Sequence, residues 1–195
     1  MKKLILATVA LLLVSASSFA QTQIWKADKA HSKVGFSISH LVVSEVEGKF
    51  SDFDVTLSTN AKGKLEKVET VIKSASINTD NESRDKHLRS DDFFAAEKFP
   101  EITFVSKSIK ATGKNGYKIT GDYTMHGVTK SVILNAKFNG EIKDPWGNVK
   151  SGWTATTTIN RFDYGLSWSK AVETGGLVVG KDVHISLKLE FGLQK

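Results

Sequence analysis

The feature that most constrains the fold is a strict alternation of apolar and polar residues near the C-terminus. Five apolar residues occupy every second position of this segment: Val183, Ile185, Leu187, Leu189 and Phe191. Successive side chains of a β-strand point to opposite faces, so a period of two predicts a strand with one face in a core. A helix with one buried face would instead repeat its apolar residues at every third or fourth position.

Similar extended patterns recur along most of the chain, and short turn-forming sequences separate them. Residues such as Asn60, Gly63, Gly113 and Gly116 supply the backbone freedom that tight reversals need. Eight strands with short connections predict an all-β fold, either an antiparallel barrel or a sandwich. Besides 182–192, the predicted strands are 33–40, 49–58, 66–77, 101–107, 117–125, 129–138 and 149–161.

One segment departs from this pattern and predicts a short helical insertion over 81–90. Thr79 and Glu82 have the spacing of a capping box, and Asp85 and Arg89 have the spacing of an ion pair along one helical face. Leu88 is nearly the only apolar residue of this helix, which therefore cannot form a core by itself. We expect the Phe93–Phe94 pair that follows to attach the insertion to the rim of the barrel.

The first twenty residues have the organisation of a secretory signal peptide. Lys2 and Lys3 precede an apolar run from Leu4 to Val14, and Ser18 and Ala20 provide the small residues of a cleavage site. We therefore expect a signal peptide at 1–20 and one domain at 21–195, located in the periplasm or secreted. The chain has no cysteine, and a single domain of this size needs no disulfide for stability.

Composition argues against several classes of function. The formal charge is +6, or +4 without the two lysines of the leader, and the basic residues are scattered, so we expect no nucleic-acid partner. We also expect no bound metal, because no two histidines are three or four positions apart. A Gly-x-Ser-x-Gly motif and a cysteine nucleophile are both missing from the sequence. The histidines are His31, His40, His87, His126 and His184.

Several motifs in a fixed order resemble the YceI-like family of polyisoprenoid-binding proteins. The most specific is the stretch 84–90, which reads Arg-Asp-Lys-His-Leu-Arg-Ser, and it is joined by 34–40, 125–130 and 159–165. The resemblance implies an eight-stranded, lipocalin-like barrel. Its long cavity would hold an isoprenoid quinone, a polyprenyl lipid or a fatty amide. It also implies an exported protein that is often dimeric. The stretch 166–180 aligns less well, which leaves one wall of the cavity undefined.

The candidate ligand-binding residues combine apolar strand positions with a few polar groups. On the insertion, Arg84 and His87 share one helical face and would meet a polar headgroup at the cavity mouth. The alternative is that Asp85 pairs with Arg89 and the helix only closes the barrel end. The full set of candidates is Phe36, Ile38, His40, Arg84, His87, Phe94 and Arg161.

Two of these candidates also have simpler interpretations. His40 shares a strand face with Phe36 and Ile38, where it would either contact ligand or be a buried histidine satisfied by its own hydrogen bonds. For Arg161 we favour a role in which it locks the barrel end through a carboxylate.

The sequence thus favours a protein that binds, sequesters or carries a long apolar lipid, with no catalytic residue and no cofactor besides that lipid. Transient contact with a membrane and a homodimer are both compatible with this role. An eight-stranded barrel either fills its interior or holds one small ligand. Strand faces rich in small residues, such as Gly152, Thr154, Thr156 and Thr158, would leave room for one if they point inward, but the sequence does not decide which face does. Two alternatives remain: an enzyme acting on such a lipid through His87 or His40, and a stress-response or adhesion module with a filled core.

Overall fold

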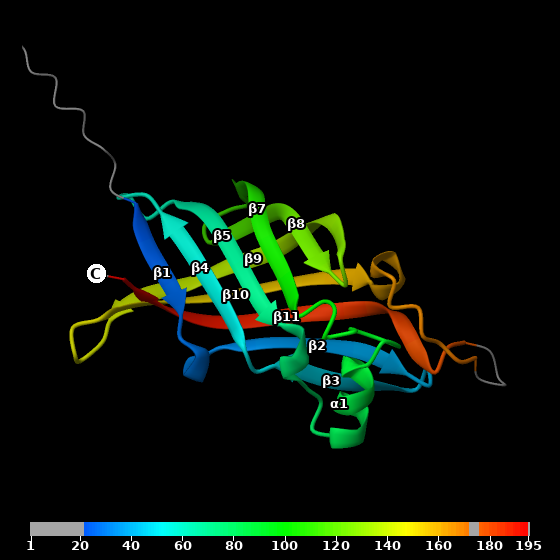
Figure 1. Ribbon diagram of the computed structural model, residues 1–195. Helices are drawn as coiled ribbons and strands as arrows, with labels where there is room; N and C mark the ends of the chain where they lie inside the picture. The colour runs from blue at the N-terminus through cyan, green and yellow to red at the C-terminus, as the bar shows by residue number, and fades with distance from the viewer. Residues whose placement is uncertain (1–21, 172–175, 195) are drawn as a thin grey trace, which may run out of the picture.

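The computed structural model describes residues 22–171 and 176–194, which form one antiparallel β-barrel (Figure 1). The predicted signal peptide at 1–20 lies outside the described residues. Eleven strand segments make up the sheet. They are β1 (Gln23–Ala27), β2 (Lys33–His40), β3 (Ser44–Phe50), β4 (Phe53–Thr59), β5 (Leu65–Lys73), β6 (Ile77–Asn78), β7 (Glu101–Ala111), β8 (Gly116–Met125), β9 (Val128–Lys143), β10 (Val149–Asn160) and β11 (Val179–Leu193).

The hydrogen-bond pattern closes eight of these segments into a ring. Their order is β1-β4-β5-β7-β8-β9-β10-β11, and β11 pairs back with β1. The first half of β11 pairs with β2, and β2 continues through β3 to β6, which extends the wall at one end. The structure therefore confirms the predicted all-β, eight-stranded antiparallel barrel.

Three long strands of the barrel are interrupted, so that each forms two segments. A 3₁₀ turn, η1 (Lys29–His31), separates β1 from β2, and another, η2 (Ser74–Ser76), separates β5 from β6. A bend at Ser51 and Asp52 separates β3 from β4. The strand predicted at 49–58 is thus two segments, β3 and β4. The chain bends between them, where the closed ring meets the extension formed by β2, β3 and β6. The short strand β1 was not predicted.

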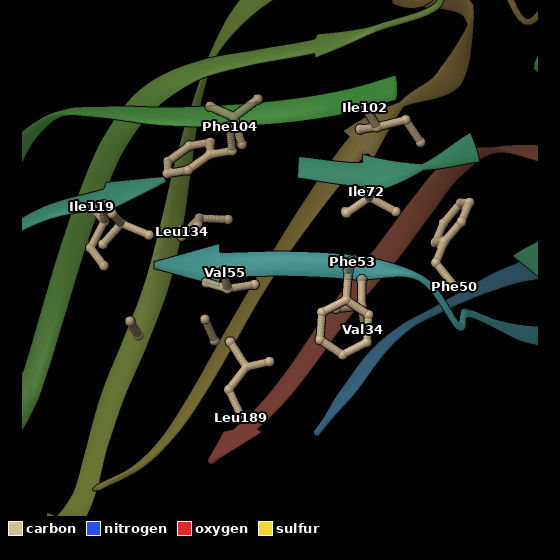
Figure 2. Packing of buried hydrophobic residues seen from close by; sticks show 14 of the residues in the cluster. Val34, Phe50, Phe53, Val55, Ile72, Ile102, Phe104, Ile119, Leu134 and Leu189 are labelled. Atoms are coloured by element: carbon tan, nitrogen blue, oxygen red, sulfur yellow. The ribbon is translucent and has the colours of Figure 1, made fainter. Parts of the chain in front are cut away.

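Large apolar side chains fill the interior of the ring, and Figure 2 shows several of them converging from different strands. Val68 of β5, Ile119 of β8 and Leu189 of β11 are all buried there. Phe191 is the most completely enclosed, with 0% of its surface exposed. This part of the barrel is a packed core.

The predicted insertion is the helix α1 (Glu82–Arg89), which lies beside β3 in Figure 1. Its N-cap is Asn81, whose side chain accepts a hydrogen bond from the backbone N–H of Arg84, and not Thr79 as the capping-box pattern suggested. Thr79 instead donates its N–H and hydroxyl to the buried carboxylate of Asp85, at 2.9 and 2.6 Å.

The prediction of an ion pair between Asp85 and Arg89 is also wrong. With Asp85 turned inward to Thr79, the Arg89 guanidinium donates to the carbonyl oxygens of Ala75 and Ile77 on the chain leading into the helix. The helix is held by hydrogen bonds to neighbouring backbone. As predicted, Phe93 is buried and Phe94 packs against the core. Within the described parts of the chain, no helix has the length and apolar character required to cross a bilayer.

Candidate ligand cavity

A cavity of about 280 Å³ lies inside the barrel on the side where β2, β3 and α1 extend the wall. Its lining is almost entirely apolar and comes from most of the strands, from α1 and from the segment after η3 (Arg161–Tyr164). The volume is near the lower end of the range for ligand pockets, roughly 300–1,000 Å³. The barrel is therefore hollow at one end and filled at the other.

The strand β11 runs through both environments. Its inward residues Val183, Ile185 and Leu187 line the cavity and are only partly covered, whereas Leu189 and Phe191 are buried in the packed core. On β2, which pairs with this half of β11, Phe36 lies opposite Ile185, and Ile38 lies opposite Val183. The candidates Phe36 and Ile38 both line the cavity, next to these residues of β11.

Aromatic rings form one wall. Phe36 contacts Phe50 with ring centroids 5.8 Å apart, and Phe50 meets the candidate Phe94 edge-on at 5.8 Å. Gly48 lies directly across from Phe36 in the sheet, and a Cβ atom at Gly48 would come within 2.4 Å of the Phe36 ring. The glycine therefore lets the ring lie flat against β3 and keeps it out of the cavity space.

The helix α1 contributes Arg84 and His87, and both line the cavity. Arg84 donates through Nε to the Thr79 hydroxyl at 2.7 Å and through Nη2 to the Thr79 carbonyl at 2.8 Å. His87 Nε2 lies 2.8 Å from an oxygen of Asp92, and both side chains are partly exposed to solvent. The other contacts of His87 are edge-on to Phe93 and Trp168, with centroids 5.0 and 5.4 Å away.

Arg161 begins η3 at the end of β10 and is 2% exposed. The sequence favoured a carboxylate partner for Arg161, but its partners in the structure are main-chain carbonyl oxygens. Arg161 Nε donates to the Gly180 carbonyl at 2.8 Å, Nη2 donates to Val179 at 3.1 Å, and Nη1 donates to Leu166. Asp163 instead pairs with Lys130, at 3.7 Å. Burial without a nearby carboxylate lowers the pKa of Arg161 from its usual value.

His40 ends β2 on the cavity side and is half-buried. Within residues 22–171 and 176–194, its imidazole makes no hydrogen bond, so the interpretation of His40 as a fully satisfied core histidine finds no support there. All seven candidate residues, Phe36, Ile38, His40, Arg84, His87, Phe94 and Arg161, thus line one cavity.

The face of β10 that carries the small residues does not point inward. Its inward face carries Ser151, Trp153, Ala155, Thr157 and Ile159, which are buried or half-buried. The set Gly152, Thr154, Thr156 and Thr158 occupies the outer face, where Thr158 hydrogen-bonds His184 of β11 at 2.9 Å. The outward face of a strand at a barrel surface tolerates threonine well, so the small residues there do not create the cavity.

Several lining residues were not predicted from the sequence. Leu166, Trp168, Val178 and Val179 come from the stretch that resisted alignment, and they form the wall left undefined. Tyr123 of β8 also lines the cavity, and burial raises the pKa of its phenol. The alternation of residues in β8 is consistent with an inward Tyr123. It does not distinguish an inward residue at a cavity from an inward residue in a packed core, because both have the same pattern.

The strongest cluster of charged groups lies away from the cavity, at the rim near β1. Lys150 Nζ lies 3.1 Å from Asp28 and 3.2 Å from Glu190, and His31 Nδ1 lies 3.0 Å from Asp28. These contacts, with His31 first, lower the pKa of Asp28 to about 2. Asp28, His31 and Glu190 are close enough for their ligand atoms to share a cation, but the Lys150 ammonium already lies between the two carboxylates.

A closed antiparallel barrel with an apolar cavity and a few donors at one end defines the class of ligand-holding β-barrels. The chain belongs to the YceI-like domain family, whose model matches residues 25–191. Its curated relatives include a UPF0312 protein of Staphylococcus aureus, 43% identical over 86% of this chain and 96% of the relative. A UPF0312 protein of Pseudomonas savastanoi is 42% identical over 80% of this chain and 81% of the relative.

Solved structures show the same fold. The YceI protein of Campylobacter jejuni is 34% identical, with a TM-score of 0.70 over 86% of this chain and 96% of that one. BcnA of Burkholderia cenocepacia has a TM-score of 0.73 at 22% identity over 84% and 98% of the two chains. A domain of Saccharophagus degradans described as polyisoprenoid-binding has a TM-score of 0.62 at 16% identity over 87% and 98%.

Proposed function

We propose that this protein binds a long apolar lipid, with an isoprenoid as the preferred class, and carries or sequesters it outside the cytoplasm. The observation that carries the proposal is the apolar cavity between β2, β11 and α1. The likeness to a domain described as polyisoprenoid-binding supports the class of ligand, and the signal-peptide pattern at 1–20 supports the location.

The size of the cavity limits how much of the ligand it covers. At about 30 Å³ for each group of the size of a water molecule, 280 Å³ holds roughly nine such groups. A methylene group is of similar size, so the cavity accommodates about two isoprene units. The cavity is partly open, and the remainder of a longer tail would extend through this opening.

The competitor for the lipid is a membrane. Burying one methylene group gains about 0.8 kcal/mol relative to water, but a bilayer offers nearly the same gain. Transfer between bilayer and barrel is therefore nearly neutral in hydrophobic terms, and the fit of the cavity and the contacts of the headgroup decide selectivity. This balance suits reversible exchange, as a carrier requires.

The tip between β2 and β3 supports transient contact with a membrane. Leu41, Val42 and Val43 are exposed there, Val43 to 87%. The N–H of Leu41 donates to the carbonyl of Val178, a residue of the cavity wall. An apolar tip attached to the wall of the cavity would bring the opening to the bilayer surface during exchange.

The proposal is tested by native mass spectrometry of protein purified from bacterial cells, with two variants on adjacent positions of β10. Thr157 faces the cavity and Thr156 faces outward, so Thr157→Phe fills the cavity and Thr156→Phe does not. We expect an added mass, extractable into organic solvent, on the wild type and on Thr156→Phe, and its loss from Thr157→Phe. A wild type without added mass in repeated preparations, or an unchanged adduct on Thr157→Phe, would contradict the proposal.

A further inference from the structure

The charged side chains that line the cavity are all basic. Arg84 and Arg161 are cationic, and no aspartate or glutamate of the described ranges lines the cavity. A mainly apolar cavity strengthens every electrostatic interaction inside it. The sign of this small set of charges therefore matters for which headgroup the cavity accepts.

The charge of Arg161 is not neutralised by a carboxylate. The guanidinium is almost fully buried, and the three hydrogen bonds found for it all end on main-chain carbonyl oxygens. Carbonyl dipoles partly solvate a cation but leave its net charge in place. Isolated buried charges are costly, and in proteins they are normally paired or serve as ligand contacts.

Arg84 also has no carboxylate partner among its hydrogen bonds, and its side chain is more exposed to solvent than that of Arg161. Its two hydrogen bonds end on the hydroxyl and the carbonyl of Thr79. The nearby carboxylate of Asp85 accepts from the Thr79 hydroxyl and N–H. Since a guanidinium carries five N–H donors, Arg84 keeps three that this network does not use.

Several lysines of the protein behave differently from its three arginines. Seven lysines of the described residues make ion pairs with carboxylates, as in Lys73–Glu101 at 2.6 Å and Lys107–Asp122 at 2.7 Å. No arginine makes an ion pair within the described residues; Arg84, Arg89 and Arg161 donate to neutral oxygens instead. The arginine charges around α1 and the adjoining wall of the cavity thus face neutral oxygens and no carboxylate of the described chain.

The two cavity arginines belong to connected parts of this wall. His87, one turn after Arg84 on α1, meets Trp168 edge-on. Trp168 follows Leu166, whose carbonyl accepts from Arg161. A headgroup held at the α1 end would contact Arg84 directly and experience the positive potential of Arg161.

We infer that the ligand of this cavity is an anionic amphiphile, with a carboxylate or phosphate headgroup bound at Arg84 and an apolar tail in the cavity. This inference rests on the proposed function and adds to it the chemistry of the headgroup. A guanidinium suits both anions because its planar fork of donors matches two oxygens at once. A neutral alcohol or amide would leave the positive charge uncompensated.

The experiment compares ligands that share one tail: farnesyl phosphate, farnesoic acid and farnesol, each titrated at neutral pH into protein freed of bound lipid by organic extraction and refolding. We expect one or both anions to bind at least about tenfold more tightly than farnesol, as charge-assisted hydrogen bonds imply. The order of phosphate and carboxylate identifies the headgroup. Equal affinity for all three would overturn the inference and leave the proposed function standing, whereas no binding of any of them would overturn both.

Two arginine variants on the same helix separate a headgroup contact from a structural role. Arg84→Gln keeps donors for Thr79 but removes the charge, and we expect it to lose the preference for anions over farnesol. Arg89→Gln is the matched control, because Arg89 makes the same kind of bonds to carbonyls but does not line the cavity. An anion preference that survives in Arg84→Gln, or is lost equally in Arg89→Gln, would contradict the assignment.

Discussion

The two halves of β11 have the same sequence pattern and opposite roles. Leu189 and Phe191 fill the barrel interior, while Ile185 and Leu187, on the same face of the same strand, border an empty space. The difference comes from their surroundings. The C-terminal half pairs with β1 inside the closed ring, and the N-terminal half pairs with β2, where the wall is extended and α1 covers the end. Dense packing stabilises one end of the barrel, whereas the other end is packed less densely and encloses a cavity.

The largest effect should come from truncating the packed end. Phe191→Ala removes a fully enclosed ring and should lower the free energy of unfolding by about 3–5 kcal/mol. Ile185→Ala enlarges a cavity that already exists, and its cost should be near the low end for such changes, about 2 kcal/mol. Denaturant unfolding of both variants measures the contrast. Equal losses would mean that the two ends are packed alike.

A second test concerns how the hollow end is stabilised without dense packing. Arg161→Leu removes the donors of three main-chain carbonyls, and because buried acceptors without partners are costly, we expect a loss of about 3 kcal/mol. Hydrogen exchange should show faster opening of η3 and the start of β11, with β1 and β4 unaffected. Protection factors that fall uniformly over the barrel would indicate that Arg161 does not act locally.

A third test changes the cavity through the sheet that borders it. Gly48→Ala places a methyl group against the Phe36 ring. The ring must then move toward the cavity, with an expected cost of about 2 kcal/mol and weaker binding of an apolar ligand. Gly152→Ala, on the outer face of β10 where the nearest atom lies 3.6 Å away, is the control and should change neither. Unaltered binding in Gly48→Ala would show that Phe36 does not limit the volume.

The smallest effect is a dependence on pH confined to the packed end. The pKa of Asp28 is about 2 in the folded protein, against an ordinary value of 3.8. A lowered carboxyl pKa stabilises the folded state above pH 3.8, and this stabilisation is lost as the pH falls toward 2. Because Asp28 is partly exposed, we expect the contribution to be only about 1 kcal/mol. Asp28→Asn should remove this part of the acid sensitivity; a variant with the same acid profile as the wild type would exclude Asp28 as its source.

The fold could be predicted because the alternation of residues such as Val183 to Phe191 reports directly which face of a strand points inward. The same alternation says nothing about what lies opposite, so it could not distinguish Leu189, in the packed core, from Leu187, at the cavity. On β10 the sequence left open which face points inward. Thr154 and Thr156 are small but point outward, and the register that decides this is set by pairing with β9 and β11.

The polar contacts of the site were predicted less well. The spacing of Asp85 and Arg89 favours an ion pair in an isolated helix, but the fold brings Thr79 to Asp85 and the carbonyls of Ala75 and Ile77 to Arg89. Arg161 was expected to find a carboxylate, yet Leu166 just after η3 and the first two residues of β11 supply carbonyls. In each case the partner comes from a segment that local spacing cannot position. The candidates nevertheless line one cavity, because their motifs fall on β2, on α1 and at the end of β10.

The most direct test of the account is a crystal structure of the protein purified from bacterial cells without detergent or added lipid. We predict elongated electron density that begins near Arg84, runs along the wall formed by Phe36 and Ile185, and ends where Leu189 closes the interior. The same space occupied by rearranged side chains, with no density along this wall, would contradict the claim that this end of the barrel is built to hold a ligand.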